Sequence, residues 1–156
     1  MSDQIAVMNH DEIVQKGTPE QIYADPADLF IAQFLGSTNL FEGVVSEIRQ
    51  NGFLTIELPD GTEVSCRGKS SSVGSRATIS VRPEAISVPD RRGSGSGQDN
   101  VILGNVTNET YSGATVRYEV AAKDRNMIVI NPASKRIPVG DEVEVRFAPE
   151  NAIAFA

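Results

Sequence analysis

The stretches GVVSEIRQNG (residues 43–52) and GNVTNETYSG (residues 104–113) decide the fold, because they repeat one turn pattern at two places in the chain. Each begins and ends on glycine at the same interval, and each carries a valine followed by a hydroxyl residue at the same positions. A second pair of segments repeats in the same order. Val73-Gly74 precedes Pro83-Glu84, and Val139-Gly140 precedes Pro149-Glu150 with the same number of residues between them. Glycine and proline each impose backbone geometries that other residues resist. The pattern therefore predicts two similar β units, at about 41–88 and 101–156.

Short alternating segments between these turns have the composition of β-strands. The expected strands are residues 41–49, 53–58, 62–67, 76–82, 101–111, 114–122, 127–131, 141–147 and 152–155. No helical pattern separates them, so an all-β barrel or sandwich is expected. The polar stretch DRRGSGSGQDN, residues 90–100, is expected to be a linker or a long hairpin loop between the two units.

The first 40 residues have a different texture. Apolar residues on either side of Asn9-His10-Asp11-Glu12 predict a β-hairpin, and Thr18-Pro19-Glu20-Gln21 has the pattern of a helix start with a capping box. A second short helix, ended by Gly36, is apolar over more than one face. We expect that helix to lack cover within this segment, and therefore to be mobile or packed on a neighbouring chain.

Composition narrows the class of protein. The chain has 156 residues, 22% of them charged, a net charge of −7 and a single cysteine. One cysteine excludes an internal disulfide and fits a cytoplasmic setting. No apolar run approaches the roughly 20 residues that cross a bilayer. The negative charge argues against a nucleic-acid partner, whose phosphates require a basic surface.

No catalytic motif is complete in this sequence. RGKSSS, residues 67–72, ends like a phosphate-binding loop, but Glu63 stands where that loop needs glycine. SGSGQ, residues 94–98, resembles a signature sequence but lies in the linker. His10 is the only histidine and Cys66 the only cysteine, so metal clusters and nucleophilic triads have no basis. No enzyme activity, metal or cofactor is expected in this chain.

The best candidate site is SVRPEAISV, residues 80–88. Here Arg82 and Glu84 flank the rigid turn at Pro83, at the end of an expected strand. Such a pair is suited to clamp a partner or a small anion through charge-assisted hydrogen bonds. The alternative is an internal ion pair that secures the turn. The second copy, Ala148-Pro149-Glu150, keeps the turn and lacks the arginine, so Arg82 is the residue with scope for a further role.

Read together, these segments resemble a known family. SDQIAVMNHDEIVQKGTPEQIYADPADLFIAQFLGSTNL resembles the end of the nucleotide-binding domain of an ATP-binding-cassette importer ATPase. VRPEAI, YSGATVRYEV and VGDEVEVRFAPENAIAF resemble the C-terminal regulatory domain of the same subunits, the transport-associated oligonucleotide/oligosaccharide-binding-type (TOBE) domain of maltose, polyamine, ferric-iron and sulfate importers. The resemblance implies an OB-type β-barrel built from two similar units, preceded by a hairpin and two short helices. It divides the chain into residues 1–40, a remnant of the ATPase domain, and residues 41–156, the barrel.

The family's phosphate-binding loop, signature and switch histidine belong upstream of residue 1, and His10 comes too late to be that histidine. The resemblance thus implies a truncated tail, with ATP and magnesium expected only for the missing domain. It further implies a non-catalytic regulatory and dimerisation domain, pairing with its own copy through the barrel. The parent subunit would lie on the cytoplasmic face of the inner membrane with permease subunits, and a small solute or a protein would act as effector.

Two other functions stay open at this point. One is a small-oxyanion-binding barrel, for which Arg82, Ser46, Thr107 and backbone N–H groups are the available donors. The other is an oligonucleotide-binding module, which stacks bases on aromatic residues in a basic groove. Aromatic residues make up only 6% of the chain and its charge is −7, so the second is disfavoured.

Overall fold

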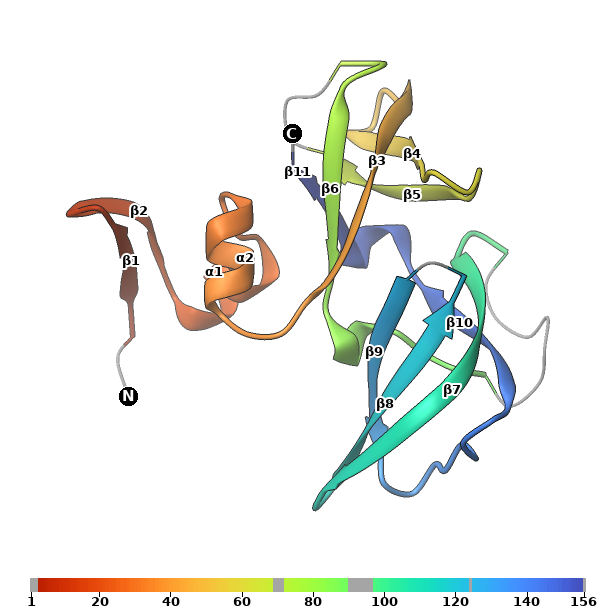
Figure 1. Ribbon diagram of the computed structural model, residues 1–156. Helices are drawn as coiled ribbons and strands as arrows, with labels where there is room; N and C mark the ends of the chain where they lie inside the picture. Colours follow the sequence, from red (N-terminus) through yellow and green to blue (C-terminus); the bar gives the residue numbers. More distant parts are fainter. Residues whose placement is uncertain (1–2, 69–71, 90–96, 124, 156) are drawn as a thin grey trace.

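A computed structural model describes residues 3–68, 72–89, 97–123 and 125–155. The elements form three groups (Figure 1). At the N-terminal side are strands β1 (Ile5–Asn9) and β2 (Glu12–Gly17) with helices α1 (Pro19–Ala24) and α2 (Leu29–Phe34). A closed barrel contains β3 (Asn39–Ile48), β4 (Phe53–Glu57), β5 (Glu63–Gly68), β6 (Arg76–Val81) and β11 (Ala152–Phe155). A four-stranded sheet contains β7 (Asn100–Ser112), β8 (Thr115–Ala122), β9 (Arg125–Pro132) and β10 (Glu142–Phe147).

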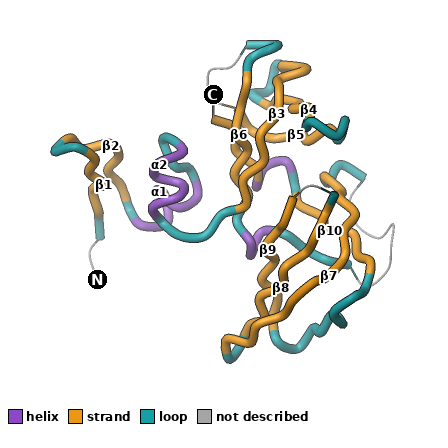
Figure 2. The backbone as a smooth tube through the Cα atoms, in the orientation of Figure 1, coloured by secondary structure: helices purple, strands orange, loops and turns teal. Residues whose placement is uncertain are grey.

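The predicted fold class is confirmed, including all nine strands of the two units. Each unit has four strands followed by a 3₁₀ turn that opens on proline, namely η1 (Pro83–Ala85) and η2 (Pro149–Asn151). Both turns lie where the barrel meets the sheet (Figure 2). The predicted linker between the units falls largely outside the described residues, as do Lys69, Ser70 and Ser71 of the loop-like stretch.

Glycine is required where each unit folds closely on itself. A Cβ at Gly43 would lie 2.6 Å from the carbonyl oxygen of Glu57, and one at Gly104 would lie 2.8 Å from that of Ala121. Both distances are far below van der Waals contact, and the clashing atoms are backbone, so a side chain does not fit without a shift of the strands. The repeated glycines therefore mark the same strand crossing in both units.

The two units exchange their last segments. β11, which follows η2, leaves the second unit and closes the barrel of the first by pairing antiparallel with β6 and parallel with β5. In return Ser87, which follows η1, pairs with Arg146 of β10 through two backbone hydrogen bonds of 2.8 Å. This exchange was not foreseen from the sequence. It joins the units into one body, since neither completes its sheet alone.

One hydrophobic core runs through both units. The buried apolar side chains of the barrel and of the four-stranded sheet form a single cluster. Phe41 of β3 and Phe147 of β10 stack across it, with ring centroids 6.4 Å apart. Such a continuous core is the arrangement expected of units of about 50 residues, which bury too little surface to fold separately.

The N-terminal hairpin turns at His10 and Asp11, which have φ values of 52° and 64°. Two consecutive positive φ angles are the signature of the tight turn that matches strand twist, and Asp is among the residues that tolerate it. The predicted capping box is present, since Gln21 N–H donates to Thr18 Oγ1 over 3.2 Å and Thr18 N–H donates to Gln21 Oε1 over 3.0 Å.

The expectation that the second helix would lack cover was wrong. Ile31 of α2 is buried in a small core with Val7 and Ile22. On another face Ala32 packs against Ile153 and Phe155 of β11, the exchanged strand. The hairpin and the barrel therefore cover two faces of α2. What remains open is the stacked pair Phe30 and Phe34, which are 38% and 65% exposed.

Candidate functional site

Arg82 joins the barrel to the N-terminal segment. Its Nη1 donates to the carbonyl oxygens of Gly36 and Ser37 over 3.2 and 3.3 Å, and its guanidinium lies 4.4 Å from the ring centroid of Tyr23. Burial lowers the pKa of Arg82. Its buried Nη2 has no hydrogen-bond partner among the described residues. The arginine thus bonds residues far from its own turn, and the described part of the chain shows no hydrogen bond or ion pair between Arg82 and Glu84.

Arg67 also joins the barrel to the N-terminal segment, and it contacts the turn η2 as well. Its Nε donates to the carbonyl oxygen of Glu150 in η2 over 2.8 Å, and its Nη2 donates to that of Ala24 over 3.2 Å. The second unit lacks an arginine before its proline, and Arg67 reaches that turn from β5 instead. Arg82, Glu84, Arg67 and Glu150 line one shallow cavity between the two turns and α1. Pro83 is buried and opens the 3₁₀ turn η1.

The donors expected for an oxyanion are not brought together. Ser46 Oγ donates to the carbonyl oxygen of Thr55, and Thr107 Oγ1 donates to that of Glu119, each within its own unit. Both sit where the strand register shifts by one residue. These hydroxyl groups hold the two bulges and do not converge with Arg82.

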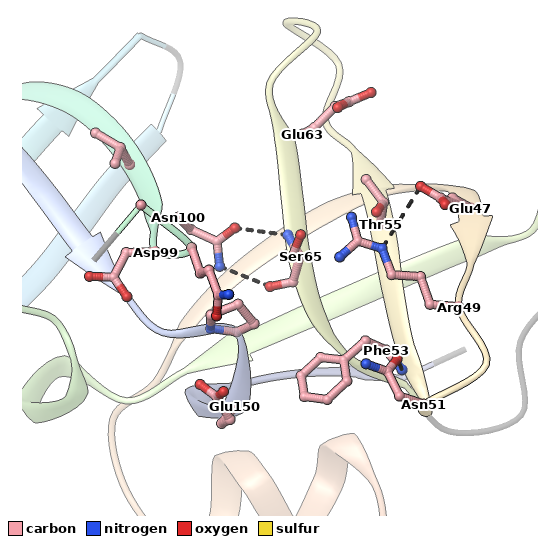
Figure 3. Close-up of a pocket in the computed structure, with 14 residues that line it drawn as sticks. Glu47, Arg49, Asn51, Phe53, Thr55, Glu63, Ser65, Asp99, Asn100 and Glu150 are labelled. Carbon is pink, nitrogen blue, oxygen red and sulfur yellow. Dashed lines mark hydrogen bonds and ion pairs between the residues drawn. The ribbon is translucent and has the colours of Figure 1, made fainter. Parts of the chain in front are cut away.

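A second cavity lies on the other side of η2, between the barrel and the start of β7 (Figure 3). We call it the acidic groove. Its volume is about 590 Å³. Its charged lining residues are four carboxylates and one arginine, namely Glu47, Glu63, Asp99, Glu150 and Arg49. Arg49 Nε lies 3.9 Å from Glu47 Oε2, so one carboxylate is partly balanced. The groove as a whole is strongly negative.

The floor of the acidic groove contains one polar group without a partner. Thr55 is 5% exposed, and its Oγ1 has no hydrogen-bond partner in the described part of the protein. Asn100 differs, because its amide accepts from Ser65 N–H and donates to Ser65 C=O, both over 2.8 Å. The side chain of Asn100 joins β7 to β5 through these two hydrogen bonds. The hydroxyl oxygen of Thr55 is buried and has no partner among the described residues.

Sequence reasoning missed this groove. In the sequence, Glu63 is notable only because it stands where a phosphate-binding loop needs glycine. The other three carboxylates come from separate elements, and their convergence depends on the exchange of strands that places η2 against β5. The available signal was the net charge of −7, which predicts acidic surface without locating it.

The remaining titratable candidates are structural. Burial raises the pKa of the Cys66 thiol to about 12, so at neutral pH it is a small apolar side chain rather than a nucleophile. His10 lies in the hairpin turn. Among the described residues, no three His, Cys, Asp or Glu side chains are placed to share a metal ion. None of the helices described is long and apolar enough to cross a membrane.

Comparison with known proteins agrees with the resemblance seen in the sequence. The TOBE domain family matches residues 79–155, which span the end of β6, η1, all of the second sheet and the exchanged strand. This chain contains a TOBE domain. The match crosses both units, as the exchange of strands requires.

Relatives extend the match over almost the whole chain. The spermidine/putrescine import ATP-binding protein of Thermotoga maritima is 31% identical over 97% of this chain and 43% of its own length. Those of Trichodesmium erythraeum and Acetivibrio thermocellus are 34% and 32% identical over 100% and 96% of this chain. The similarity to importer ATP-binding subunits is therefore confirmed. The chain spans less than half the length of these relatives.

A solved structure shares the architecture. The cytoplasmic molybdate-binding protein ModG, in a form with molybdate bound, superposes with a TM-score of 0.67 at 14% identity. The match covers 74% of this chain and 94% of ModG. At this identity the likeness shows the fold alone.

Proposed function

We propose that this TOBE domain is the non-catalytic regulatory and dimerisation part of the ATP-binding subunit of a polyamine importer. The observation that carries the proposal is the match over 96–100% of the chain, hairpin and helices included, to three spermidine/putrescine import ATP-binding proteins. A barrel that functions outside an importer subunit would not need the N-terminal hairpin and helices.

In such a subunit, ATP and magnesium bind to the nucleotide-binding domain, and the permease subunits anchor the complex at the cytoplasmic face of the membrane. The contacts of Arg82 and Arg67 support the regulatory part of the proposal. They couple the barrel to the helical segment, which resembles the end of the ATPase domain, through one cation–π contact and several hydrogen bonds. A change of state in the barrel has a direct route to that segment.

An oxyanion-binding barrel has less support. The likeness to ModG concerns the fold, and Ser46 and Thr107 are engaged in their own bulges. The larger cavity is lined by carboxylates, which repel an oxyanion. The same carboxylates would repel the phosphate groups of an oligonucleotide.

Two measurements on the isolated chain test the proposal. Isothermal titration with Mg-ATP is expected to show no heat of binding, and sedimentation velocity is expected to show a monomer–dimer equilibrium that depends on concentration. A two-fold interface closes without forming fibres. Micromolar ATP binding would overturn the non-catalytic assignment. A strictly monomeric chain at high micromolar concentration would overturn dimerisation.

A further inference from the structure

We infer that Asn51 is a site of spontaneous covalent modification, where the side-chain amide becomes a carboxylate through a cyclic imide formed with the backbone of Gly52. Asn51 is the only asparagine of the chain that glycine follows. Both residues are exposed in the turn between β3 and β4. Asn51 also lines the acidic groove, where Figure 3 shows it beside Phe53. The modification does not depend on the proposed function.

The turn leaves the backbone nitrogen of Gly52 free to react. Gly52 N–H donates to Arg49 C=O over 3.4 Å, which is longer than a typical backbone hydrogen bond. The φ angle of Gly52 is 84°, and a Cβ at this residue would meet nothing within 4 Å. Because glycine has no side chain, nothing on this residue shields the nitrogen. It is therefore weakly held and open to solvent.

The reaction requires only water and hydroxide. Hydroxide removes the proton of Gly52 N–H, and the nitrogen attacks the Cγ atom of Asn51. The Cγ–Nδ2 bond then breaks, and the leaving group takes a proton from water to become ammonia, which regenerates hydroxide. Water opens the five-membered imide at either of its two carbonyl carbons. Opening at Cγ gives aspartate, and opening at the backbone carbonyl carbon gives isoaspartate, whose main chain runs through Cβ and Cγ.

The product form of this turn already exists in the chain. Asp60 and Gly61 form the next turn, between β4 and β5, and the φ angle of Gly61 is 87°, close to that of the glycine in the first turn. Asn51 Oδ1 accepts from Phe53 N–H over 3.2 Å, and Asp60 Oδ1 accepts from Thr62 N–H over 3.0 Å. A carboxylate thus accepts the same bond as the amide. An aspartate at position 51 fits the turn and leaves the hairpin folded.

Asparagines followed by other residues lack this combination, as two of them show. Asn105 is exposed on β7, but the nitrogen that would attack it belongs to Val106, whose N–H donates to Asp141 C=O over 3.0 Å. The β-branched side chain of Val106 also stiffens and crowds that position. Asn131 precedes Pro132, whose nitrogen carries no hydrogen. Exposure of the amide alone is therefore not sufficient for the reaction.

The modification changes the charge of the acidic groove. The groove already has four carboxylates and one arginine among its lining residues, and a carboxylate at position 51 is ionised at neutral pH. The reaction releases ammonia into dilute solution, so it does not reverse. The negative charge of the groove therefore increases with the age of the chain.

The test is incubation of the folded chain at physiological temperature, at neutral and at mildly alkaline pH, followed by peptide mapping with mass spectrometry. We expect the mass gain that accompanies replacement of NH₂ by OH to occur at Asn51 several-fold faster than at Asn105. The rate should rise with pH, because the attacking species is the deprotonated nitrogen. Anion-exchange chromatography should show a more acidic species that grows at the same rate.

Three variants complete the experiment. Asn51→Gln should remove the fast mass gain, because the corresponding ring has six members and closes more slowly. Asn105→Gln removes another exposed amide and should leave the rate at Asn51 unchanged. Asn51→Asp gives the elution position of the aspartate product and should keep the thermal midpoint of the parent chain. Equal rates at Asn51 and Asn105, or a rate at Asn51 that does not depend on pH, would overturn the site. A much lower midpoint for Asn51→Asp would overturn the claim that the turn accepts the product.

Discussion

Asn39 of the first unit and Asn100 of the second unit each hydrogen-bond the backbone of the other unit. Each lies four residues before the close-approach glycine of its unit, and each is buried, with exposures of 4% and 8%. Asn39 accepts from Ile128 N–H over 2.7 Å and donates to Ile128 C=O over 2.9 Å. Asn100 makes the equivalent pair of bonds to Ser65. The side-chain amide of one unit thus completes the third strand of the other.

This relationship predicts that both asparagines stabilise the interface between the units. Replacing either by alanine removes the two hydrogen bonds to the other unit and leaves a backbone N–H and C=O without those partners. For Asn39 it also removes a hydrogen bond of 3.3 Å to Val81 C=O within its own unit. Each variant should lose about 2–4 kcal/mol in the free energy of unfolding. Urea unfolding monitored by circular dichroism measures the loss. Asn105→Ala, at an exposed position on β7, is the control and should change stability by less than about 0.5 kcal/mol. A loss for only one of the two buried asparagines would contradict their equivalence.

A second prediction concerns the repeated glycines. Gly43→Ala and Gly104→Ala place a Cβ within 2.6 Å and 2.7 Å of the nearest atoms, so each should destabilise the fold by about 1–3 kcal/mol. Gly97→Ala is the control, because a Cβ there meets nothing within 4 Å. Thermal unfolding of the three variants compares them directly. If Gly43→Ala were as stable as the parent chain, the strand crossing would not require glycine.

The two units were predictable because their signals are local. Gly43, Gly104, Pro83 and Pro149 each act through their own backbone geometry, and alternation of apolar residues reveals the strands between them. The exchange of β11 was not predictable from the same signals. A strand that completes the other unit has the same alternation and the same turns as one that completes its own. Only the packing of the joint core distinguishes the two.

Part of the candidate site was likewise predictable from the sequence, and part was not. Arg82 stood out in the sequence because its counterpart before Pro149 is absent, and the structure gives it long-range contacts. What it touches could not be predicted, since Gly36 and Tyr23 are 46 and more positions away along the chain. Apart from the net charge of −7, no feature of the sequence pointed to the acidic groove. Its carboxylates are scattered, and their convergence is a property of the tertiary fold.

A third prediction tests whether Arg82 anchors the helical segment. Arg82→Gln removes the stacking on Tyr23 and the charge-assisted bonds to residues 36 and 37. Limited proteolysis between residues 17 and 40 should then become several-fold faster, while the barrel stays resistant. Arg76→Gln, at an exposed position at the start of β6, is the control. Equal cleavage rates in the two variants would show that the packing of Ala32 on Phe155 holds the segment without Arg82.

A fourth prediction concerns acid stability. Asp60 accepts from Thr62 N–H over 3.0 Å, and its other oxygen lies 3.1 Å from Arg125 Nη2. The hydrogen bonds from Thr62, and then Arg125, hold the pKa of Asp60 well below its ordinary value. Because the folded-state pKa is the lower one, the carboxylate stabilises the fold above the unfolded-state pKa. That contribution is lost as the pH falls towards the folded-state value.

Asp60→Asn should therefore be less stable than the parent chain at neutral pH. The difference should stay constant down to about pH 4 and shrink below it, because an unfolded-state aspartate protonates near that pH. Urea unfolding at a series of pH values measures the difference. A gap that stays constant down to about pH 2 would show that the carboxylate charge at Asp60 contributes nothing.

The central claim, that this chain is the regulatory part of a polyamine importer subunit, is tested most directly by exchange into a relative. The matching region of the Thermotoga maritima spermidine/putrescine import ATP-binding protein is replaced by this chain, and spermidine uptake by the reconstituted transporter is measured. Replacement by ModG, which shares the fold at 14% identity, is the control. We predict that the chimera with this chain takes up spermidine and that the chimera with ModG does not. A well-folded, ATP-hydrolysing chimera with this chain that takes up no more spermidine than the ModG chimera would contradict the claim.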